Sequence, residues 1–574
     1  MARGWTRRWL DWLESRTGYR ALVHAALEER IRGGASPAYV FGSVLTFILL
    51  NQIVTGILLA AYYAPSATTA WASVAYIQDQ VWLGWFVRGM HSAGASMMVL
   101  TLLLHLVQVT VYGAYRAPRE VNWLTGLLLA AVVMAFALTG YLLPWDQKGY
   151  WATQVATTLL GATPLVGRTL QTLVQGGPVY GNLTLTHFFA LHVFVLPATL
   201  ILLLVVHIAL FRRHGVTPKW GRSDEELERT ADTFWPRQLF YDLVAMGVML
   251  AFMVAWVIKT HGAELGAPAD PASAFDARPE WYFLPLYQLL KYFPGALEVV
   301  AALGAPLIAG GVLVALPFLD RAATTHPRAR RLPLALVLGG LAGATGLGLM
   351  AKVEDARNET YQKNVQAAHQ EAQRARALAL QGVLPQGGTA VYLNDPLEGG
   401  RLLFKEHCAG CHRLGPLGPV ADKDVRGPDL TRFASRSWLE AFLRDPNSPA
   451  FFGRTRVKGM KPVQATEEEL RALVEWAYSL SDPPDVDRSL AARGRQLFEE
   501  KDCDLCHELD GQTEGEGPML PGLATRGWLV RLLKEPASPL FFGDKSEMPS
   551  FANKLTEREL EQVAAFVAAQ RDAK

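Results

Sequence analysis

Two short motifs in the C-terminal third hold all four cysteines of the 574-residue sequence. They are CAGCH, with Cys408, Cys411 and His412, and CDLCH, with Cys503, Cys506 and His507. The spacing C-x-x-C-H is typical of covalent haem c attachment, in which two cysteines form thioethers and the histidine binds iron. A zinc site would need further ligands at finger-like spacing, and a thiol redox pair would not need the histidine. The sequence therefore predicts two haem c groups and leaves no cysteine for a disulfide or an iron–sulfur cluster.

A methionine follows each of these motifs before the last helical segment of its repeat. The two are Met460 in VKGMKPV and Met548 in KSEMPSF. A thioether sulfur is a common sixth ligand of haem iron. We therefore predict His412 and His507 as proximal ligands and Met460 and Met548 as distal ligands. Met519 is a competitor in the second repeat, but the first repeat has no methionine at the matching position.

Four more histidines lie in two apolar segments. His91 and His105 are 14 residues apart in MHSAGASMMVLTLLLHLVQV, and His192 and His207 are 15 apart in the second segment. On a helix both spacings return to nearly the same face after a rise of about 21–23 Å. A lone histidine there is usually a satisfied core residue, but imidazoles in hydrocarbon need compensation and four in matching pairs need a shared reason. The pairs His91 with His192 and His105 with His207 predict two noncovalent bis-histidine haem b groups.

Glycines repeat the same interval on two neighbouring apolar segments. Gly42 and Gly56 are 14 residues apart, as are Gly126 and Gly140. A porphyrin wedged between helices needs missing side chains where its face meets backbone, and glycine provides this clearance. Ordinary small-residue packing between membrane helices is the alternative. The shared interval favours haem clearance.

Seven apolar segments are long enough to cross a bilayer. They cover residues 39–63, 90–112, 123–143, 186–211, 239–259, 297–319 and 332–351. Arginine and lysine concentrate in alternate connections, including the one that carries the N-terminus. The positive-inside rule then predicts a cytoplasmic N-terminus and, after seven spans, a C-terminus on the outer (periplasmic) side of a bacterial inner membrane. Haem c is attached on that side, so the two indications agree.

The overall charge does not indicate a nucleic-acid partner. Lys+Arg number 55 and Asp+Glu 53, a formal net charge of +2, while 50% of the residues are hydrophobic. The first residues, MARGWTRRWLDWLESRTGYR, are too polar and acidic for a cleavable signal peptide. Their tryptophans and arginines indicate an amphipathic helix on the membrane surface.

An internal repeat follows a polar, Ala- and Gln-rich helical spacer. The segment GPDLTRFASRSWLEAFLRDPNSPAFFG recurs ninety positions later as the similar segment GPMLPGLATRGWLVRLLKEPASPLFFG. We predict an all-α protein, a seven-helix transmembrane bundle followed by two small helical cytochrome c domains. The expected boundaries are 1–35 (surface helix), 36–215 (four-helix dihaem domain), 216–352 (three-helix domain), 353–392 (helical linker), 393–484 (cytochrome c domain 1) and 485–574 (cytochrome c domain 2).

Residues 30–350 resemble the cytochrome b subunit of quinol–cytochrome c oxidoreductases, the bc complexes. The resemblance rests on RGMHSAGAS, APREVNW, TGYLLPWDQKGYWATQVAT, LHVFVLP, RPEWYFLPLYQLLKYFP and LPFLDR. The PWDQ wording, the 15-residue histidine interval and the seven spans resemble the cytochrome b6 plus subunit IV branch. That branch attaches an extra haem to a cysteine at the start of the first span. The matching AYVFGSVLTFILL has none, so no covalent extra haem is expected.

The resemblance implies a Q-cycle, in which quinol is oxidised at an outer site. One electron would pass to an iron–sulfur protein and the other through the b haems to a quinone site near the cytoplasmic face. Glu280 of the PEWY motif is the expected proton acceptor, because each electron leaves quinol with a proton. Tyr282 on the same loop is a second candidate. The alternative is a glutamate that only caps the loop.

Three polar residues have weaker assignments. Arg212 matches a basic residue near the cytoplasmic quinone site in the b6 branch, and Asp242 matches an acid of that site in the mitochondrial branch. Each is as well explained as an interfacial anchor or a loop charge. Arg88 resembles the family arginine that neutralises a haem propionate, and a helix-end arginine reaching the interface is its alternative.

The resemblance also implies partners. The Rieske protein must be another chain, because its [2Fe–2S] centre needs two cysteines and two histidines. Other complex subunits, the membrane quinone pool, a periplasmic cytochrome c or terminal oxidase, and a homodimeric assembly are expected by analogy. Two other functions are weighed. One is a linear dihaem anchor that passes quinol electrons to a periplasmic acceptor without bifurcation, and it would not need PEWY or the last three spans. The other is a docking module, which would not need axial methionines.

Overall fold

Helices make up nearly all the regular structure of the chain. A computed structural model describes every residue except 1, 179, 272, 274, 420–424 and 573–574. The chain forms two compact units, Met1–Thr389 and Ala390–Lys574. Within the described residues the one sheet has two short antiparallel strands, Arg30–Ile31 (β1) and Asp232–Thr233 (β2). The predicted all-α fold is confirmed.

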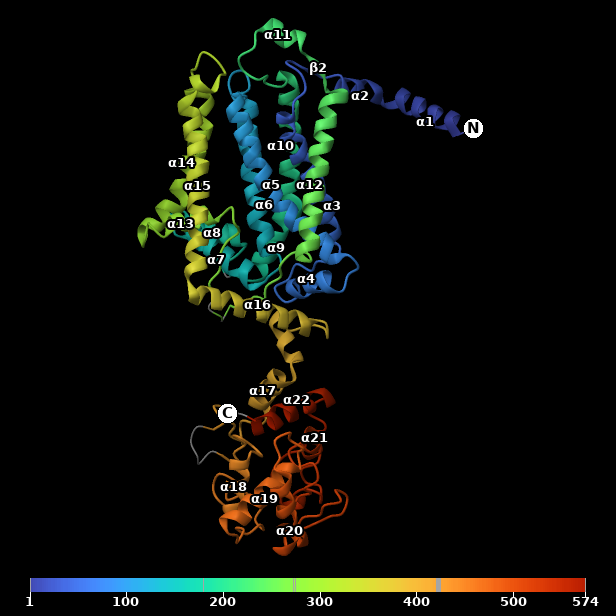
Figure 1. The fold of residues 1–574 in the computed structure, drawn as a ribbon, viewed down its shortest axis with the longest axis vertical. Coiled ribbons are helices and arrows are strands. Elements are labelled where there is room, and N and C mark those ends of the chain that lie inside the picture. The colour runs from blue at the N-terminus through green and yellow to red at the C-terminus, as the bar shows by residue number, and fades with distance from the viewer. Residues whose placement is uncertain (1, 179, 272, 274, 420–424, 573–574) are drawn as a thin grey trace. The chain divides into compact units, whose positions relative to one another are not determined.

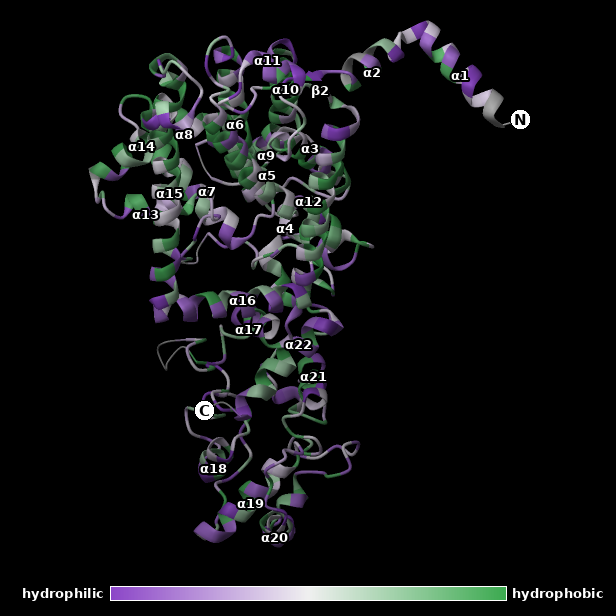
Figure 2. Cartoon of the chain, turned by 45° about the horizontal axis from the view of Figure 1, so that its top comes forward, coloured by the Kyte–Doolittle hydropathy of each residue, from purple (hydrophilic) through white to green (hydrophobic). Residues whose placement is uncertain are grey.

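Seven helices of the first unit are long and apolar enough to cross a membrane, as predicted. They cover Phe41–Ala60 (α3), Gly84–Tyr112 (α5), Glu120–Leu142 (α6), Asn182–His214 (α9, η2 and α10), Phe234–Thr260 (η3 and α12), Leu297–Leu319 (in α14) and Arg331–Arg357 (α15). The fourth is continuous through α9 (Asn182–Ala190), the π-helical turn η2 (Leu191–Val195) and α10 (Leu196–His214). The helices run side by side (Figure 1), and apolar residues predominate along them (Figure 2).

Shorter elements join and cap these spans. They are α1 (Ala2–Thr17), α2 (Tyr19–Leu27), η1 (Pro37–Tyr39), α4 (Ala70–Asp79), α7 (Gln147–Gly161), α8 (Gly167–Gln175), α11 (Asp224–Arg229), α13 (Leu284–Leu290), η4 (Pro327–Ala329) and α16 (Glu359–Ala379). Within the spans, η3 (Phe234–Gln238) leads into α12 (Leu239–Thr260), and α14 covers Ala296–Leu319. The N-terminal segment is two helices, because Gly18 between them adopts a left-handed backbone with φ of 61°.

Two helix pairs position the four membrane histidines. Helix α3 packs along α5, and α6 packs along α10. Helix α12 covers α5 through a buried contact of Met90 with Met253 and Val257. Each histidine-bearing helix thus has a neighbour that carries two of the predicted glycines.

A buried ion pair fastens the α14–α15 connection to the end of α5. Arg330 donates from Nε to Asp320 Oδ2 over 2.8 Å and from Nη2 to the Thr110 carbonyl over 2.8 Å. Tyr115 donates to the same Asp320 oxygen over 2.7 Å. A buried charge is tolerated when it is paired and hydrogen-bonded, and both conditions are met here.

The second unit contains two copies of a helical pattern. Its helices are α17 (Pro396–His407), α18 (Arg436–Arg444), α19 (Glu467–Ser479), α20 (Arg488–Glu500), α21 (Arg526–Lys534) and α22 (Glu557–Ala568), with 3₁₀ turns η5 (Gly388–Asn394), η7 (Cys503–Leu505), η8 (Gly543–Lys545) and η9 (Ala569–Asp572). Helices α19 and α22 begin with the same capping box, Thr466 with Glu469 and Thr556 with Glu559. In both copies a tryptophan indole donates to the backbone nine residues earlier, Trp438 to Asp429 and Trp528 to Met519.

Candidate haem and quinol sites

His91 on α5 and His192 in the π-helical turn η2 face each other. Their ring centroids are 6.4 Å apart and their planes are inclined by 67°. A metal–imidazole bond is about 2 Å long, so this separation leaves room for one iron between the two rings. A π-helical turn adds a residue to the helix and is frequent at functional sites; Pro197, which cannot donate a backbone hydrogen bond, follows one turn later.

Three of the four histidines are held by a threonine hydroxyl. Thr55 Oγ1 lies 2.9 Å from His91 Nδ1, Thr139 Oγ1 lies 3.0 Å from His192 Nδ1, and Thr125 Oγ1 lies 3.2 Å from His207 Nδ1. Each hydroxyl also donates its proton to a backbone carbonyl of its own helix, that of Asn51, Ala135 and Asn122 respectively.

These hydrogen bonds decide the tautomer of each ring. A hydroxyl whose proton is already donated can only accept from imidazole, so Nδ1 carries the hydrogen. Nε2 is then the free nitrogen with the lone pair that an iron ligand requires. The arrangement fits an iron bound at Nε2 of His91, His192 and His207.

The glycine after each threonine faces the same imidazole. A Cβ on Gly56 would lie 3.3 Å from His91 Cε1, one on Gly126 would lie 3.2 Å from His207 Cε1, and one on Gly140 would lie 2.6 Å from His192 Cε1. The last distance is shorter than any real Cβ contact, so a larger residue would displace the ring. These three glycines therefore give clearance to the histidines themselves.

His105 is the exception. Gly42, the glycine at the corresponding interval, follows Phe41 instead of a threonine, and a Cβ on it would meet no described atom within 4 Å. His105 Nδ1 is buried and has no hydrogen-bond partner in the described part of the chain. The threonines escaped the sequence analysis, although the repeated dipeptide Thr-Gly at 55–56, 125–126 and 139–140 was the signal that marks them.

Arg88 is buried at the start of α5 and contacts the connection after α12. Its guanidinium donates to Gln78 Oε1 and the Ala263 carbonyl over 2.8 Å each, and to the Glu264 carbonyl over 2.5 Å. These bonds hold α4, α5 and the 262–267 segment together. Neutralisation of a haem propionate by Arg88 stays a prediction.

The PEWY segment lies against the PWDQKGY segment. Glu280 Oε1 and Lys148 Nζ form an ion pair of 2.9 Å, with about a third of each side chain exposed. Burial opposes the charge of Lys148, but the carboxylate of Glu280 holds the pKa of Lys148 above its ordinary value. Burial raises the pKa of the Tyr282 phenol, which therefore stays protonated at neutral pH. An acid–base pair of this kind suits proton transfer from a bound hydroxyl compound.

Asp146 joins the PWDQKGY segment to the 262–267 segment. Its carboxylate accepts hydrogen bonds from the amides of Gly149 over 2.8 Å and Gly266 over 2.9 Å. The amide of Gln147 donates to the Ala267 carbonyl over 2.9 Å. The sequence analysis gave Asp146 no role, and the structure shows that it fastens the 262–267 segment to the start of α7.

Asp242 and Arg212 both lie at the end of the bundle that carries the N-terminal helices. Asp242 is buried and accepts from Ser43 Oγ over 2.8 Å and from Gln238 Nε2 over 2.9 Å. Arg212 pairs with Glu29 over 3.1 Å. Both side chains have protein partners, and a quinone site at either stays a prediction.

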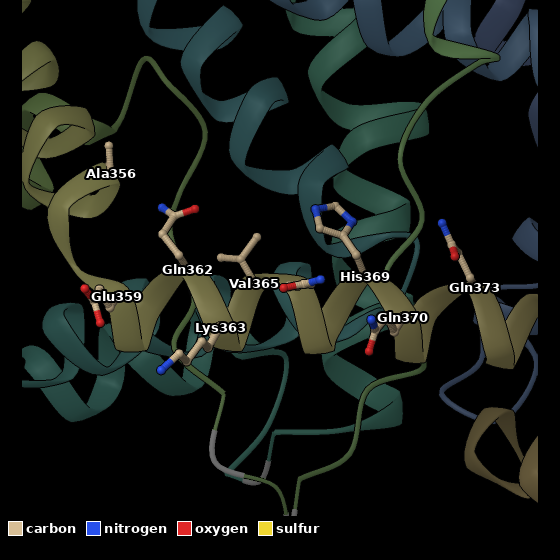
Figure 3. Close-up of a pocket in the computed structure, with 9 residues that line it drawn as sticks. Ala356, Glu359, Gln362, Lys363, Val365, His369, Gln370 and Gln373 are labelled. Atoms are coloured by element: carbon tan, nitrogen blue, oxygen red, sulfur yellow. The ribbon is translucent and has the colours of Figure 1, made fainter.

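Helix α16 crosses one end of the spans and carries a groove of about 650 Å³ (Figures 1 and 3). In the close-up, Gln362, Val365 and His369 point to one side of the helix and Lys363 to the other. His369 pairs with Glu264 over 3.4 Å, and Arg376 Nε donates to Asp79 over 3.0 Å. The groove is open, most of its lining residues are of polar type, and it contains none of the predicted site residues.

The histidines of the two C-x-x-C-H motifs have matching environments. His412 Nδ1 donates to the Pro428 carbonyl and His507 Nδ1 to the Pro518 carbonyl, both over 2.9 Å. A carbonyl can only accept, so Nε2 is again free for iron. Gly427 would place a Cβ 2.4 Å from His412, and Gly517 is equivalent for His507 at 2.6 Å. These residues fit a haem c group bound at each motif.

The distal candidates are half-buried and lie in the loops before α19 and α22. Met460 and Met548 occupy equivalent places, whereas Met519 is buried and its carbonyl accepts from Trp528. Cys408 is buried, which raises the pKa of its thiol to about 12, and Cys411 is exposed.

Comparisons with known sequences agree with this arrangement. The family models described as "Cytochrome b/b6/petB" and "Cytochrome b(C-terminal)/b6/petD" match residues 30–215 and 268–367. Those described as "Cytochrome c" and "Cytochrome C oxidase, cbb3-type, subunit III" match residues 397–481 and 489–567. The fold and sites thus define a multi-pass membrane haem protein with cytochrome c domains.

Three relatives illustrate the similarity. "Cytochrome b" of Cereibacter sphaeroides is 38% identical over 50% of this chain and 67% of its own length. "Menaquinol:cytochrome c reductase cytochrome b subunit" of Geobacillus thermodenitrificans is 40% identical over 36% of this chain and 96% of its own length. "Cytochrome b/c1" of Bradyrhizobium diazoefficiens is 34% identical over 56% of this chain and 47% of its own length. The chain belongs to the cytochrome b family.

Proposed function

We propose that this chain is the electron-transfer subunit of a bacterial cytochrome bc complex, a quinol–cytochrome c oxidoreductase. The observation that carries the proposal is the opposed pair His91 and His192, 6.4 Å apart, with both Nδ1 atoms held by threonine. The two haem c motifs in the same chain would hold the carriers that accept electrons from the iron–sulfur protein. The relatives named as menaquinol:cytochrome c reductase and cytochrome b/c1 support the assignment.

The cofactors proposed are two noncovalent haem b and two covalent haem c groups. When bound, they supply one-electron carriers that take quinol electrons to a cytoplasmic-side quinone site on one branch and, after a separate Rieske protein, to the c haems on the other. His91 with His192 and His105 with His207 are the proposed b ligands. Gly42, Gly56, Gly126 and Gly140 are proposed to leave space for the haem b groups, and Arg88 is the proposed partner of a haem propionate.

Residues of the outer loops are proposed to accept the protons released by quinol. A carboxylate oxygen of Glu280 lies 2.9 Å from the Lys148 ammonium, and the Glu280 charge acts on the nearby Tyr282. We assign Glu280 as acceptor of a quinol proton, with Lys148 compensating its charge when no quinol is bound. Tyr282 orients the quinol hydroxyl as a donor. Arg212 and Asp242 are the proposed groups at the second quinone site.

The proposed orientation in the membrane follows from the distribution of arginine and lysine among the connections between the spans. The N-terminus lies in the cytoplasm and the cytochrome c domains lie outside, where a periplasmic cytochrome c or terminal oxidase accepts electrons. Other subunits and a homodimeric complex complete the assembly. The domain boundaries proposed from the sequence are retained at 35, 215, 352, 392 and 484.

Oxidant-induced reduction of haem b tests this function. The purified complex is supplied with quinol, the cytoplasmic-side quinone site is blocked, an oxidant is added, and b-haem absorbance is followed. We expect the b haems to become more reduced while the c haems become oxidised. Simultaneous oxidation of b and c haems would overturn the proposal and favour a linear conduit.

A further inference from the structure

The helices of the second unit pair across the two repeats. Sequence order leads to the expectation that α17 packs on α19 and α20 on α22, so that each repeat closes on itself. Instead, α17 packs on α22, and α19 packs on α20. Each crossing therefore combines the helix before one C-x-x-C-H motif with the helix after the methionine of the other repeat.

The α17–α22 crossing is close. A Cβ on Gly400 would lie 2.1 Å from the Gln562 carbonyl oxygen and 2.6 Å from Phe566 Cβ, so only glycine allows this approach. The rings of Phe404 and Phe566 are 5.9 Å apart in an edge contact. Gln562 Nε2 also donates over 2.5 Å to the carbonyl of Leu393, just before α17.

The α19–α20 crossing repeats this geometry with the repeats exchanged. A Cβ on Gly494 would lie 2.0 Å from the Ala472 carbonyl oxygen and 2.7 Å from Trp476 Cβ. The rings of Trp476 and Phe498 are 4.4 Å apart. Lys501 Nζ lies 3.2 Å from Glu469 Oε2 and donates to the Gln464 carbonyl over 3.0 Å.

The hydrophobic cores follow the same exchange. The cluster that contains Cys408 and Phe404 includes Phe551 and, at its edge, Met548. The cluster around Trp476 and Phe498 has Cys503 at its edge beside Val463, three residues after Met460. Each cysteine motif thus shares a core with the methionine loop of the other repeat.

The short connection between the repeats explains why the exchange is possible. Helix α19 ends at Ser479 and α20 begins at Arg488, so the two form a local helical hairpin with a small loop-closure cost. Arg436 fastens the connection, because it donates to Glu475 over 2.6 Å and to Asp485 over 2.7 Å. Exchange of identical elements between two copies is a low-cost rearrangement in proteins.

We propose that each haem c site is composite. The haem on Cys408 and Cys411 takes His412 and Met548 as axial ligands, and the haem on Cys503 and Cys506 takes His507 and Met460. The inference rests on the two haem c groups of the proposed function. It re-partners the methionines that sequence order assigns within each repeat.

Carbodiimide cross-linking of the intact complex tests the helix exchange without any activity measurement. We expect a zero-length link between Lys501 and Glu469. In the self-closed arrangement Lys501 would instead meet Glu559, which lies ninety positions after Glu469 and caps α22 in the same way. Lys534 and Glu557, 2.6 Å apart within the second repeat, are linked in either arrangement and serve as the internal control. Mixing ¹⁵N-labelled and unlabelled chains separates links within a chain from links between chains. A Lys501–Glu559 link, or absence of the Lys501–Glu469 link while the control link forms, would overturn the exchange.

Axial ligation is tested in a full-length background with one haem c. Cys503→Ala with Cys506→Ala leaves only the haem on Cys408 and Cys411. In this background Met548→Ala should abolish the sulfur-to-iron charge-transfer band of the oxidised haem, and Met460→Ala should keep it. The opposite result would restore ligation within each repeat. Because the readout is a band of the attached haem, a failed Q-cycle would leave it unchanged.

Discussion

His192 and Thr139 are joined by a 3.0 Å contact between imidazole Nδ1 and the threonine hydroxyl, while Gly140 leaves the ring its place. The hydroxyl donates its own proton to the Ala135 carbonyl, so the imidazole is the donor to threonine. Thr55 makes the same arrangement with His91. In the proposed haem b sites, the orientation and basicity of the histidine ligands would therefore depend on threonines that do not contact the iron.

Thr139→Val is expected to raise the midpoint potential of the haem b bound by His192. Loss of the acceptor makes imidazole a weaker donor to iron, which disfavours the oxidised state. A tenfold change in relative stability corresponds to about 59 mV for a one-electron couple, so we expect a rise of tens of mV. Redox titration of the b-haem bands measures it. Thr46→Val on α3 is the control, because its hydroxyl donates only to the Gly42 carbonyl. A lowered or unchanged potential would contradict this positioning role.

Gly140→Ala is expected to remove one haem b. Its Cβ would lie 2.6 Å from His192 Cε1, so the imidazole must move from its ligand position. The measurement is haem b content per chain by the pyridine haemochrome assay, with haem c as internal standard. Gly247→Ala on α12 is the matched control, since a Cβ there meets no described atom within 4 Å. Full haem b content in Gly140→Ala would show that the helices adjust.

Glu280→Gln is expected to slow quinol oxidation by roughly 10²-fold, because general acid–base groups contribute about 10²–10⁴-fold to rates. The amide keeps a hydrogen bond to Lys148 but cannot take the quinol proton. Steady-state quinol–cytochrome c reductase activity is the measurement, and unchanged haem spectra show that the fold is intact. Glu225→Gln on the exposed α11 serves as control. Activity of Glu280→Gln within twofold of the parent would remove Glu280 from the proton path.

The Arg436–Glu475 pair predicts a pH-dependent stability of the second unit. Hydrogen bonds from Arg436 hold the pKa of Glu475 below its ordinary value. A carboxyl with a lowered folded-state pKa stabilises the fold above its unfolded pKa, and this contribution is lost as pH falls through the folded value. Glu475→Gln should cost about 1.5–3 kcal/mol near neutral pH, the range for hydrogen bonds to charged groups. The cost should shrink in acid.

Thermal unfolding of the intact chain from pH 7 downward measures this difference. Glu468→Gln, at an exposed position of the same helix, should change neither the melting temperature nor its pH dependence. A destabilisation of Glu475→Gln that is the same at every pH would indicate lost packing instead of the lowered pKa.

Much of this protein follows from residue types and their spacing. Hydrophobic length predicts the seven spans, and covalent haem c attachment requires two cysteines separated by two residues and followed directly by a histidine. The 14- and 15-residue histidine intervals are set by helix geometry, which holds wherever the helix lies. These features can be predicted from the sequence because the groups involved are close together along the chain.

Other features depend on packing between distant segments. The hydroxyls of Thr55, Thr125 and Thr139 reach imidazoles that lie 36, 82 and 53 residues away, and Lys148 meets Glu280 from 132 residues away. A threonine in an apolar helix can have many roles. Only the histidine on the neighbouring helix shows that these threonines hold an imidazole.

The two repeats show this division most sharply. Their sequences determine that a helix bearing glycine will cross a helix bearing an aromatic residue, as Gly400 does with Phe566 and Gly494 with Trp476. They do not determine which copy provides each partner, because α19 and α22 have the same capping box and carry an aromatic residue, Trp476 or Phe566, at the equivalent position. In the tertiary structure the short connection between α19 and α20 favours packing of these two neighbouring helices. Helix α17 then packs on α22.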